Sequence, residues 1–222
     1  GWQAEAMPWL QSSLLIGAVA LALATLSGQP WWWRVIHAFF MPLVWVTYSL
    51  AIDPGWFLLA FVLLLLVYRG ALSGQVPLYL SNRETVAALD ELLGKEEAEH
   101  FLDLGAGLGS TVIPLADRWP DKHFTGVENA PLTWLAGRIL GVGRSNLDWR
   151  WGDLWATPLH DHDLVYAFLS PAPMPELWEK VKAEMKPGSL FVSNSFPVPG
   201  EVPLKVIEVD CTPPRPLYCY RI

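Results

Sequence analysis

The chain has 222 residues, 52% of them hydrophobic, and carries a formal net charge of −7 at pH 7. Surfaces that bind nucleic acid are basic, so this acidic balance argues against a nucleic-acid partner. The charge is unevenly distributed, because residues 6–68 contain only Arg34 and Asp53 as formal charges. The first third of the chain is therefore strongly apolar, and most charged residues follow it.

Three apolar runs occupy this first third, at residues 12–26, 35–52 and 56–68. A membrane-spanning helix needs about 20 apolar residues. The second run has this length, the first reaches it when extended back toward Trp9, and the third is short. Helices of soluble domains show a polar face, which these runs lack. We predict a transmembrane helical region over residues 1–69 with three spans, the alternative being two spans or a hairpin with one interfacial helix. Interfacial aromatic residues stand at the ends of the runs: Trp31, Trp32, Trp33, Trp56 and Tyr68.

Charged residues beside the runs indicate an orientation in the membrane. With three spans, Arg34 and Arg69 fall on one side of the bilayer. Glu5 and Asp53 then fall on the other side. Because basic residues favour the cytoplasmic side, we expect the C-terminal part of the chain to face the cytoplasm. The sequence thus predicts a multi-pass protein of an inner or plasma membrane, with the lipid bilayer as a partner.

Residues 70–98 are expected to form a linker followed by a helix. The glycine-bounded stretch 70–74 is the linker. Ser81 and Glu84 have the spacing of a capping box, in which Ser81 caps the helix and Glu84 bonds back to it. The pattern predicts that this helix ends at Gly94.

The remainder of the chain alternates between predicted strands and helices. Alternating units of this kind imply an α/β fold, with a parallel sheet covered by helices on both faces. A final pair of strands reads as an antiparallel hairpin, so we expect a Rossmann-like sheet with an antiparallel C-terminal edge. Predicted strands cover 100–104, 124–128, 147–151, 164–168 and 190–195, the helices cover 110–118, 130–140 and 174–185, and the hairpin covers 205–211 and 217–221.

The first strand runs into a glycine-rich turn, Asp103-Leu104-Gly105-Ala106-Gly107-Leu108-Gly109. Glycine allows tight backbone conformations and close approach of a ligand. An acid directly before the glycines suits a positively charged group and fits a pyrophosphate poorly. This combination predicts binding of S-adenosylmethionine (SAM), which carries an ammonium and a sulfonium. A nicotinamide-binding fingerprint would instead place its third glycine at position 110, which is Ser110.

Two further acids follow the second and third predicted strands. Glu128 stands where an acid accepts the hydroxyls of a ribose, and Asn129 comes next to it. Asp153 follows the third strand, where it is suited to the adenine amino group, with Leu154 packing against the ring. Because the carboxyl ends of parallel strands line one crevice, we expect these acids and Asp103 to share one cofactor site.

These residues together resemble the class I SAM-dependent methyltransferases from residue 99 to the C-terminus. Longer stretches are similar to a family of membrane-anchored protein-lysine methyltransferases, whose mitochondrial members modify the ATP synthase c-subunit or the adenine nucleotide translocase and which has prokaryotic relatives. That family also carries an N-terminal apolar segment. The similar stretches are VPLYLS at 76–81, DLW at 153–155, DLVYAF at 163–168, MKPG at 185–188 and SNSFPVPG at 193–200.

The resemblance implies a methyltransferase domain over residues 99–222 that modifies a lysine side chain of a membrane protein. Methyl transfer from a sulfonium is an in-line displacement that needs positioning more than acid or base chemistry. An apolar wall favours the neutral, reactive amine by desolvation. The candidates for this wall follow the fourth and fifth strands: Tyr166, Phe168, Ser170 and Phe196. Tyr79 and Ser81, in the segment before the first helix of the domain, are the candidates for substrate contact.

Two other functions are consistent with the sequence. The protein is alternatively a methyltransferase of a lipid, a quinone or another small molecule at the membrane. It is also consistent with a non-catalytic, SAM-binding membrane assembly factor, although three intact acids speak against an inactive site. No metal is expected, because the His160-Asp161-His162 cluster reads as a solvated loop.

Overall fold

The computed structural model describes residues 2–67, 81–210 and 214–222. The chain divides into two compact units, Gly1–Phe61 and Val62–Ile222, which are described separately. The predicted linker at 70–74 and the substrate candidate Tyr79 lie outside the described residues.

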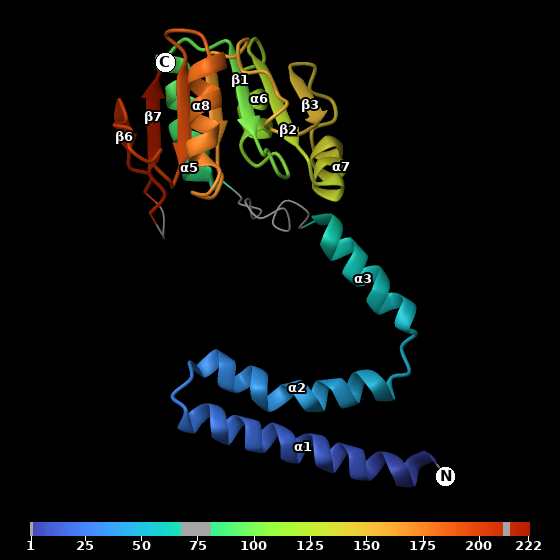
Figure 1. Ribbon diagram of the computed structural model, residues 1–222. Helices are drawn as coiled ribbons and strands as arrows, with labels where there is room; N and C mark the ends of the chain where they lie inside the picture. Colours follow the sequence, from blue (N-terminus) through green and yellow to red (C-terminus); the bar gives the residue numbers. More distant parts are fainter. Residues whose placement is uncertain (1, 68–80, 211–213) are drawn as a thin grey trace. The chain divides into compact units, whose positions relative to one another are not determined.

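The apolar first third of the chain is helical, as its composition predicts. Helices α1 (Trp2–Leu26) and α2 (Trp31–Ser49) pack against each other, and α3 (Pro54–Val67) follows them in sequence (Figure 1). The two packed helices approach closely at Gly17, where an added Cβ would lie 2.3 Å from the carbonyl oxygen of Ala38. A small residue at such a crossing lets two helix backbones meet, which is common between membrane helices.

Among the described residues, one helix is long and apolar enough to cross a membrane. Its apolar window, Trp9–Leu26, has 18 residues. The apolar part of α3, Pro54–Leu66, is shorter. Helix α2 has sufficient length, but Arg34 and His37 lie in its first two turns and lower its hydropathy. The three runs are thus three helices, while their number of membrane crossings stays a prediction.

The second unit is an α/β domain with a seven-stranded sheet in the order β3-β2-β1-β4-β5-β7-β6. Strands β1 to β5 are parallel, and β7 pairs antiparallel with both β5 and β6. This topology confirms the predicted Rossmann-like sheet with its antiparallel C-terminal hairpin. The elements are α5 (Arg83–Lys95), β1 (His100–Leu104), α6 (Val112–Arg118), β2 (His123–Glu128), α7 (Pro131–Leu140), β3 (Leu147–Trp151), β4 (Leu164–Ala167), α8 (Met174–Glu184), β5 (Leu190–Asn194), β6 (Lys205–Ile207) and β7 (Leu217–Arg221).

Helix α5 begins one residue later than its capping pattern predicts. Asn82, and not Ser81, is the N-cap, and its side chain accepts a hydrogen bond from the Thr85 backbone N–H. Asn and Ser are similarly good N-caps, so sequence alone does not separate neighbouring candidates. The helix also continues through Gly94 and ends at Lys95.

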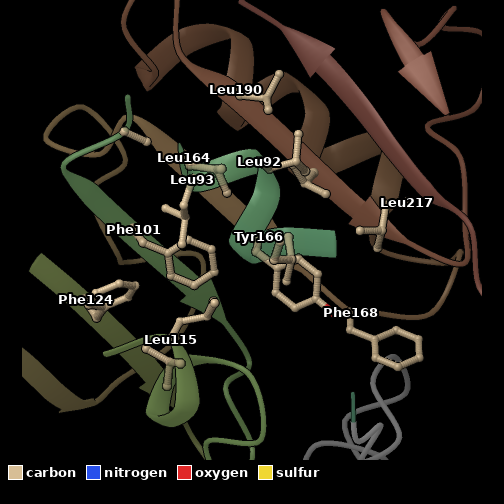
Figure 2. Packing of buried hydrophobic residues seen from close by; sticks show 14 of the residues in the cluster. Leu92, Leu93, Phe101, Leu115, Phe124, Leu164, Tyr166, Phe168, Leu190 and Leu217 are labelled. Atoms are coloured by element: carbon tan, nitrogen blue, oxygen red, sulfur yellow. The ribbon is translucent and has the colours of Figure 1, made fainter. Parts of the chain in front are cut away.

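Two hydrophobic clusters sandwich the sheet. One lies under α5, α6 and α7, and the other lies under α8. Alternation along β1 divides its side chains between them, with Phe101 on the first face and Leu102 on the second. Figure 2 shows Phe101, Tyr166 and Leu115 gathered in the first cluster. Burial on both faces fixes the register of β1, because a shift by one residue would exchange all its side chains between the faces.

Candidate active site

The chain order of the sheet reverses between β1 and β4. Strands β1, β2 and β3 extend to one side of this point, and β4 and β5 extend to the other. Open α/β sheets bind ligands outside the carboxyl ends of their strands at such a switch point. The sequence-predicted cofactor residues lie in the last residues of strands β1 and β2 or directly after β1, β2 and β3, at this edge.

The glycine-rich turn after β1 is held to β2 by backbone hydrogen bonds. The N–H groups of Gly105 and Ala106 both donate to the carbonyl oxygen of Val127, at 3.0 and 2.9 Å. Gly105 and Gly109 have φ angles of 78° and 82°, in the left-handed region that favours glycine. An added Cβ at Gly109 would also lie 2.4 Å from Cδ1 of Ile113 in α6. The turn therefore requires glycine for its backbone shape and for its packing on the following helix.

Asp103 is a buried acid at this switch point. It lies in register between Gly126 of β2 and Tyr166 of β4, and only 3% of its surface is exposed. Burial, followed by the nearby negative charge of Glu128, raises the pKa of its carboxyl group to about 8. A nearby cation stabilises the charged form of a carboxyl group in this environment, and the ammonium group of a bound ligand is such a cation. Leu104, the next residue, is fully buried in the cluster under α8.

Glu128 ends β2 and organises the backbone around it. Its Oε2 accepts a 2.9 Å hydrogen bond from the N–H of Gly107. Its Oε1 accepts from the N–H groups of Asn129 and Ala130, at 2.9 and 2.8 Å. Glu128 thus ties the glycine-rich turn to the start of α7. A carboxylate has about four lone-pair positions, so one acceptor position on Oε2 remains available to a ribose hydroxyl.

Asp153 and its neighbours form a turn after β3. The Asp153 side chain is exposed, and its Oδ1 accepts a hydrogen bond from the Trp155 backbone N–H at 3.1 Å. Leu154 is half-buried and packs against the cluster under α8. Asn129 is exposed, and its backbone oxygen accepts a 3.2 Å hydrogen bond from the Trp151 indole N–H. The structure therefore places Asn129 at the end of β2 and Asp153 at the end of the adjacent strand β3.

A buried polar network lies beside Asp103 on the same face of the sheet. The Asn194 side-chain amide donates a 2.7 Å hydrogen bond to the Tyr166 phenolic oxygen. Ser81 Oγ lies 2.8 Å from the same oxygen, and the Ser81 backbone N–H donates to Ser110 Oγ at 3.2 Å. Tyr166, a sequence-predicted catalytic residue, is thus the centre of a network that joins β4, β5, the entry to α5 and the glycine-rich turn. Sequence reasoning did not select Asn194, although it belongs to one of the stretches that carry the family resemblance.

The other catalytic candidates follow β4 and β5. Phe168 is 7% exposed, and the Arg215 guanidinium lies 5.5 Å from the centre of its ring. Phe196 is half-buried against the cluster under α5, and its backbone oxygen accepts a 2.6 Å hydrogen bond from Ser193 Oγ. Ser170 is half-buried in the loop between β4 and α8.

Among the described residues, no group of histidine, cysteine, aspartate or glutamate is arranged to hold a metal ion. His160 and Asp161 are exposed and pair with each other at 3.2 Å. His162 is buried, which differs from the predicted solvated loop, and burial lowers its pKa. A groove between α5 and the segment around β6, lined by residues that include Glu91 and Lys205, contains none of the candidate site residues.

The strand order, the glycine-rich turn after β1 and the position of acids at or just beyond the ends of β1, β2 and β3 are those expected of a class I SAM-dependent methyltransferase. Two solved structures share the fold. An RNA methyltransferase from Salinibacter ruber in complex with S-adenosyl-L-homocysteine has a TM-score of 0.58 and 23% identity, covering 65% of this chain and 94% of that chain. A putative O-methyltransferase from Klebsiella pneumoniae has a TM-score of 0.51 and 15% identity, covering 70% of this chain and 86% of that chain.

The chain belongs to this class of enzymes, and its cofactor is S-adenosylmethionine. More narrowly, residues 103–205 match the family of the ANTKMT methyltransferase domain. The chain is also similar to the adenine nucleotide translocase lysine N-methyltransferase of Mus musculus, with 29% identity over 174 residues. That alignment covers 74% of this chain and 67% of the mouse protein.

Proposed function

We propose that this protein is a membrane-anchored methyltransferase that transfers methyl groups from SAM to lysine side chains of a membrane protein. The observation that carries this proposal is the 174-residue similarity to a protein named as a lysine N-methyltransferase of the adenine nucleotide translocase. The apolar helix window Trp9–Leu26 supports the anchor, because its length and composition suffice to cross a bilayer.

The residues after β1, β2 and β3 take separate parts of the cofactor in this proposal. Asp103 binds the ammonium group, and Gly105, Ala106, Gly107 and Gly109 let the backbone approach the cofactor closely. Glu128 and Asn129 bind the ribose, and Asp153 and Leu154 bind the adenine. The buried position of Asp103 supports its part, because a neighbouring ammonium offsets the desolvation that raises its pKa.

The proposed transfer is a single in-line displacement. The neutral Nζ of the acceptor lysine attacks the methyl carbon of the sulfonium, and the N–C bond forms as the C–S bond breaks. The electron pair of the broken bond stays on sulfur, and S-adenosylhomocysteine leaves as a neutral thioether. Because the ordinary pKa of lysine is about 10.4, the amine loses its proton before it attacks.

The residues after β4 and β5 form the acceptor side of the proposed site. Phe168 and Phe196 present apolar surface, which favours the neutral form of the amine by desolvation. Burial and the charge of Asp103 raise the pKa of Tyr166, so this phenol remains neutral and acts through hydrogen bonds and not as a base. Ser170 and Ser81 supply further polar contacts, and Tyr79 completes the substrate contact in this proposal.

The membrane location of the protein is part of the same proposal. We place the apolar region in an inner or plasma membrane as a multi-pass anchor, with the methyltransferase domain facing the cytoplasm. The distribution of Arg34 and Arg69 relative to Glu5 and Asp53 supports this orientation. A tether of this kind raises the effective concentration of acceptors that share the membrane.

A methyl-transfer assay tests the proposed function. The purified full chain is incubated with SAM carrying a tritiated methyl group and with membranes from cells that lack the protein. We expect label in a membrane protein, mapped to lysine. The Asp103→Asn variant should abolish labelling, whereas Glu179→Gln, a change at an exposed side chain of α8, should leave it unchanged. Label in the lipid extract alone would instead identify a lipid or quinone methyltransferase. Binding of SAM without transfer would identify an assembly factor.

A further inference from the structure

Helix α7 presents apolar side chains to solvent instead of to the core. Leu135, Ile139 and Val142 are 46%, 63% and 73% exposed. Their spacing of four and three residues places them along one stripe of the helix and its C-terminal extension. We call these three residues the α7 stripe.

The opposite face of α7 explains why this stripe points outward. Thr133 and Gly137 are the buried residues of the helix. An added Cβ at Gly137 would lie 2.1 Å from Cζ2 of Trp149, so the helix backbone rests directly on this indole ring. The inner face is thus made of small residues that fit against a large one. The α7 stripe takes no part in this packing, and its exposure to water is unfavourable for the isolated domain.

Tryptophan and arginine side chains border the stripe. The Arg138 guanidinium lies 5.6 Å from the centre of the Trp134 ring. Trp134 in turn lies 5.9 Å from the ring of Trp151, which is 61% exposed. Trp residues and long basic side chains are the groups that favour the boundary between lipid headgroups and acyl chains.

We propose that the α7 stripe docks into the headgroup region of a lipid bilayer. This inference rests on the membrane location in the proposed function. Apolar residues beside amphipathic aromatic rings are the composition of surfaces that lie in a membrane interface. The exposed Arg138 guanidinium is suited to donate hydrogen bonds to the phosphate groups of lipids at this surface.

The length of the chain makes this contact possible. Helix α3 ends at Val67 and α5 begins at Arg83. At roughly 3.5 Å per residue, the chain between them spans at most about 55 Å. A domain tethered to a bilayer by this segment stays close to the lipid surface, so even a small apolar patch meets it at high effective concentration.

Docking through α7 would orient the proposed active site. Trp151 donates its indole N–H to the backbone oxygen of Asn129, which adjoins Glu128. The border of the α7 stripe therefore adjoins the residues assigned to the cofactor ribose. Because α7 connects two parallel strands, it runs from the carboxyl edge of the sheet back toward the start of β3, and the stripe lies along the side of the domain. Docking through the stripe would therefore hold the carboxyl edge beside the bilayer contact, within reach of a membrane protein.

Site-specific fluorescence in a bilayer tests this contact directly. The full chain, with Cys211→Ser and Cys219→Ala, is reconstituted in nanodiscs of phosphatidylcholine and phosphatidylglycerol and labelled with an environment-sensitive dye at Ile139→Cys. The control carries the dye at Glu179→Cys, on the exposed side of α8. We expect lipids with spin-labelled acyl chains to quench the dye at position 139 severalfold more strongly than at 179. Equal quenching at the two positions, or shielding at 139 only when an acceptor protein is added, would overturn the proposal.

An activity measurement separates docking from catalysis. The variant Ile139→Asp with Val142→Asp should lower methylation of a bilayer-embedded acceptor by about tenfold. It should leave methylation of the same acceptor in detergent unchanged, as should the control Glu179→Gln with Lys182→Gln in both settings. An equal loss in bilayer and detergent would contradict a docking role. If the unmodified chain transfers no methyl group in the bilayer or in detergent, the proposed function is rejected. The quenching measurement would still show whether the α7 stripe contacts the bilayer.

Discussion

The side-chain amide of Asn194 donates a hydrogen bond to the phenolic oxygen of Tyr166, with 2.7 Å between the two atoms. Asn194 is fully buried and Tyr166 is 1% exposed, so water does not compete for this contact. Because an amide nitrogen only donates, the phenolic oxygen must accept, and its own hydrogen is free to be donated to Ser81. The pair joins β5 to β4, and the 2.8 Å contact between the phenolic oxygen and Ser81 Oγ, in which either atom can be the donor, extends the network to the entry of α5.

Replacing Tyr166 by Phe should destabilise the protein through Asn194. The amide would be left buried without its acceptor, which costs about 1–3 kcal/mol in the free energy of unfolding. Ser81→Ala is the matched control, because it removes a half-buried partner and keeps the Asn194–Tyr166 bond. Urea unfolding of the SAM-free proteins measures the difference. If both variants unfold at the same urea concentration, the amide has found another acceptor and the network does not stabilise the fold.

Glu128→Gln should weaken SAM binding by disturbing the glycine-rich turn. The carboxylate accepts from the N–H groups of Gly107, Asn129 and Ala130 with both its oxygens. A glutamine amide retains one acceptor oxygen and turns its NH2 group toward at least one of these donors. Losing a hydrogen bond to a charged acceptor costs about 1.5–3 kcal/mol, so we expect the dissociation constant for SAM to rise at least tenfold. Calorimetric titration with SAM measures this change, and an unchanged constant would show that Glu128 orders neither turn nor ribose.

The raised pKa of Asp103 should make stability depend on pH. The pKa of its carboxyl is about 8 in the folded protein, against an ordinary aspartate value of 3.8 in the unfolded chain. Between these pH values the folded state holds a proton that the unfolded state has lost, so the free energy of unfolding falls as pH rises. Asp103→Asn lacks this group, and its stability relative to the unmodified chain should increase from about pH 4 to about pH 8 and then level off. Denaturant unfolding across this range measures the difference, and a difference that is constant with pH would contradict the raised pKa.

Binding of SAM should release a proton from the same group. The cofactor ammonium favours the charged form of Asp103, so its pKa falls on binding and SAM affinity rises with pH up to about 8. At pH 7 the released proton appears as a difference in binding heat between two buffers of different ionisation enthalpy. Identical heats in the two buffers would mean that the ammonium does not lie against Asp103.

Much of the sheet was predictable from local sequence. The strands at 100–104 and 147–151 occur where the apolar patterns placed them, and the hairpin forms with β7 between β5 and β6. The central strand β1 is a short, mostly apolar run before turn residues, whereas the edge strand β3 alternates between apolar and polar residues, and both signals are contained in the sequence itself. The position of the glycine-rich turn was predictable for the same reason, since Gly105 and Gly109 require a backbone that other residues adopt poorly.

The site contacts were not predictable in the same way. Asn82, and not the predicted Ser81, is the N-cap of α5. The Ser81 hydroxyl instead contacts the phenolic oxygen of Tyr166, which is 85 residues away in the sequence. The bond from Asn194 to Tyr166 depends on the pairing of β4 with β5, and no local pattern encodes it. The sequence predicts that Glu128 binds a ligand. In the structure its carboxylate also accepts hydrogen bonds from three backbone N–H groups, and these contacts depend on the path of the glycine-rich turn. The hydrogen-bond partners of a polar residue thus depend on tertiary contacts and not only on its position in a strand.

The Trp149 ring packs so closely on Gly126 that we expect no larger residue to fit there without strain. An added Cβ at Gly126 would lie 2.6 and 2.7 Å from Cζ3 and Cε3 of the Trp149 ring, which is itself held between β2 and α7. Gly126→Ala should therefore destabilise the domain by about 1–3 kcal/mol through overpacking. Gly152→Ala is the matched control in the adjacent strand end, because its Cβ would meet Val127 at an ordinary 3.7 Å.

A double-mutant cycle shows whether the indole ring is the cause. Trp149→Phe removes part of the ring that the new methyl group would strike, and it also removes the 2.9 Å hydrogen bond from the indole N–H to the Trp134 backbone oxygen. If the ring is the obstacle, Gly126→Ala costs less in the Trp149→Phe background than in the unmodified chain, and the two losses are not additive. Additive losses in the free energy of unfolding would place the strain elsewhere, because two residues that do not touch combine independently.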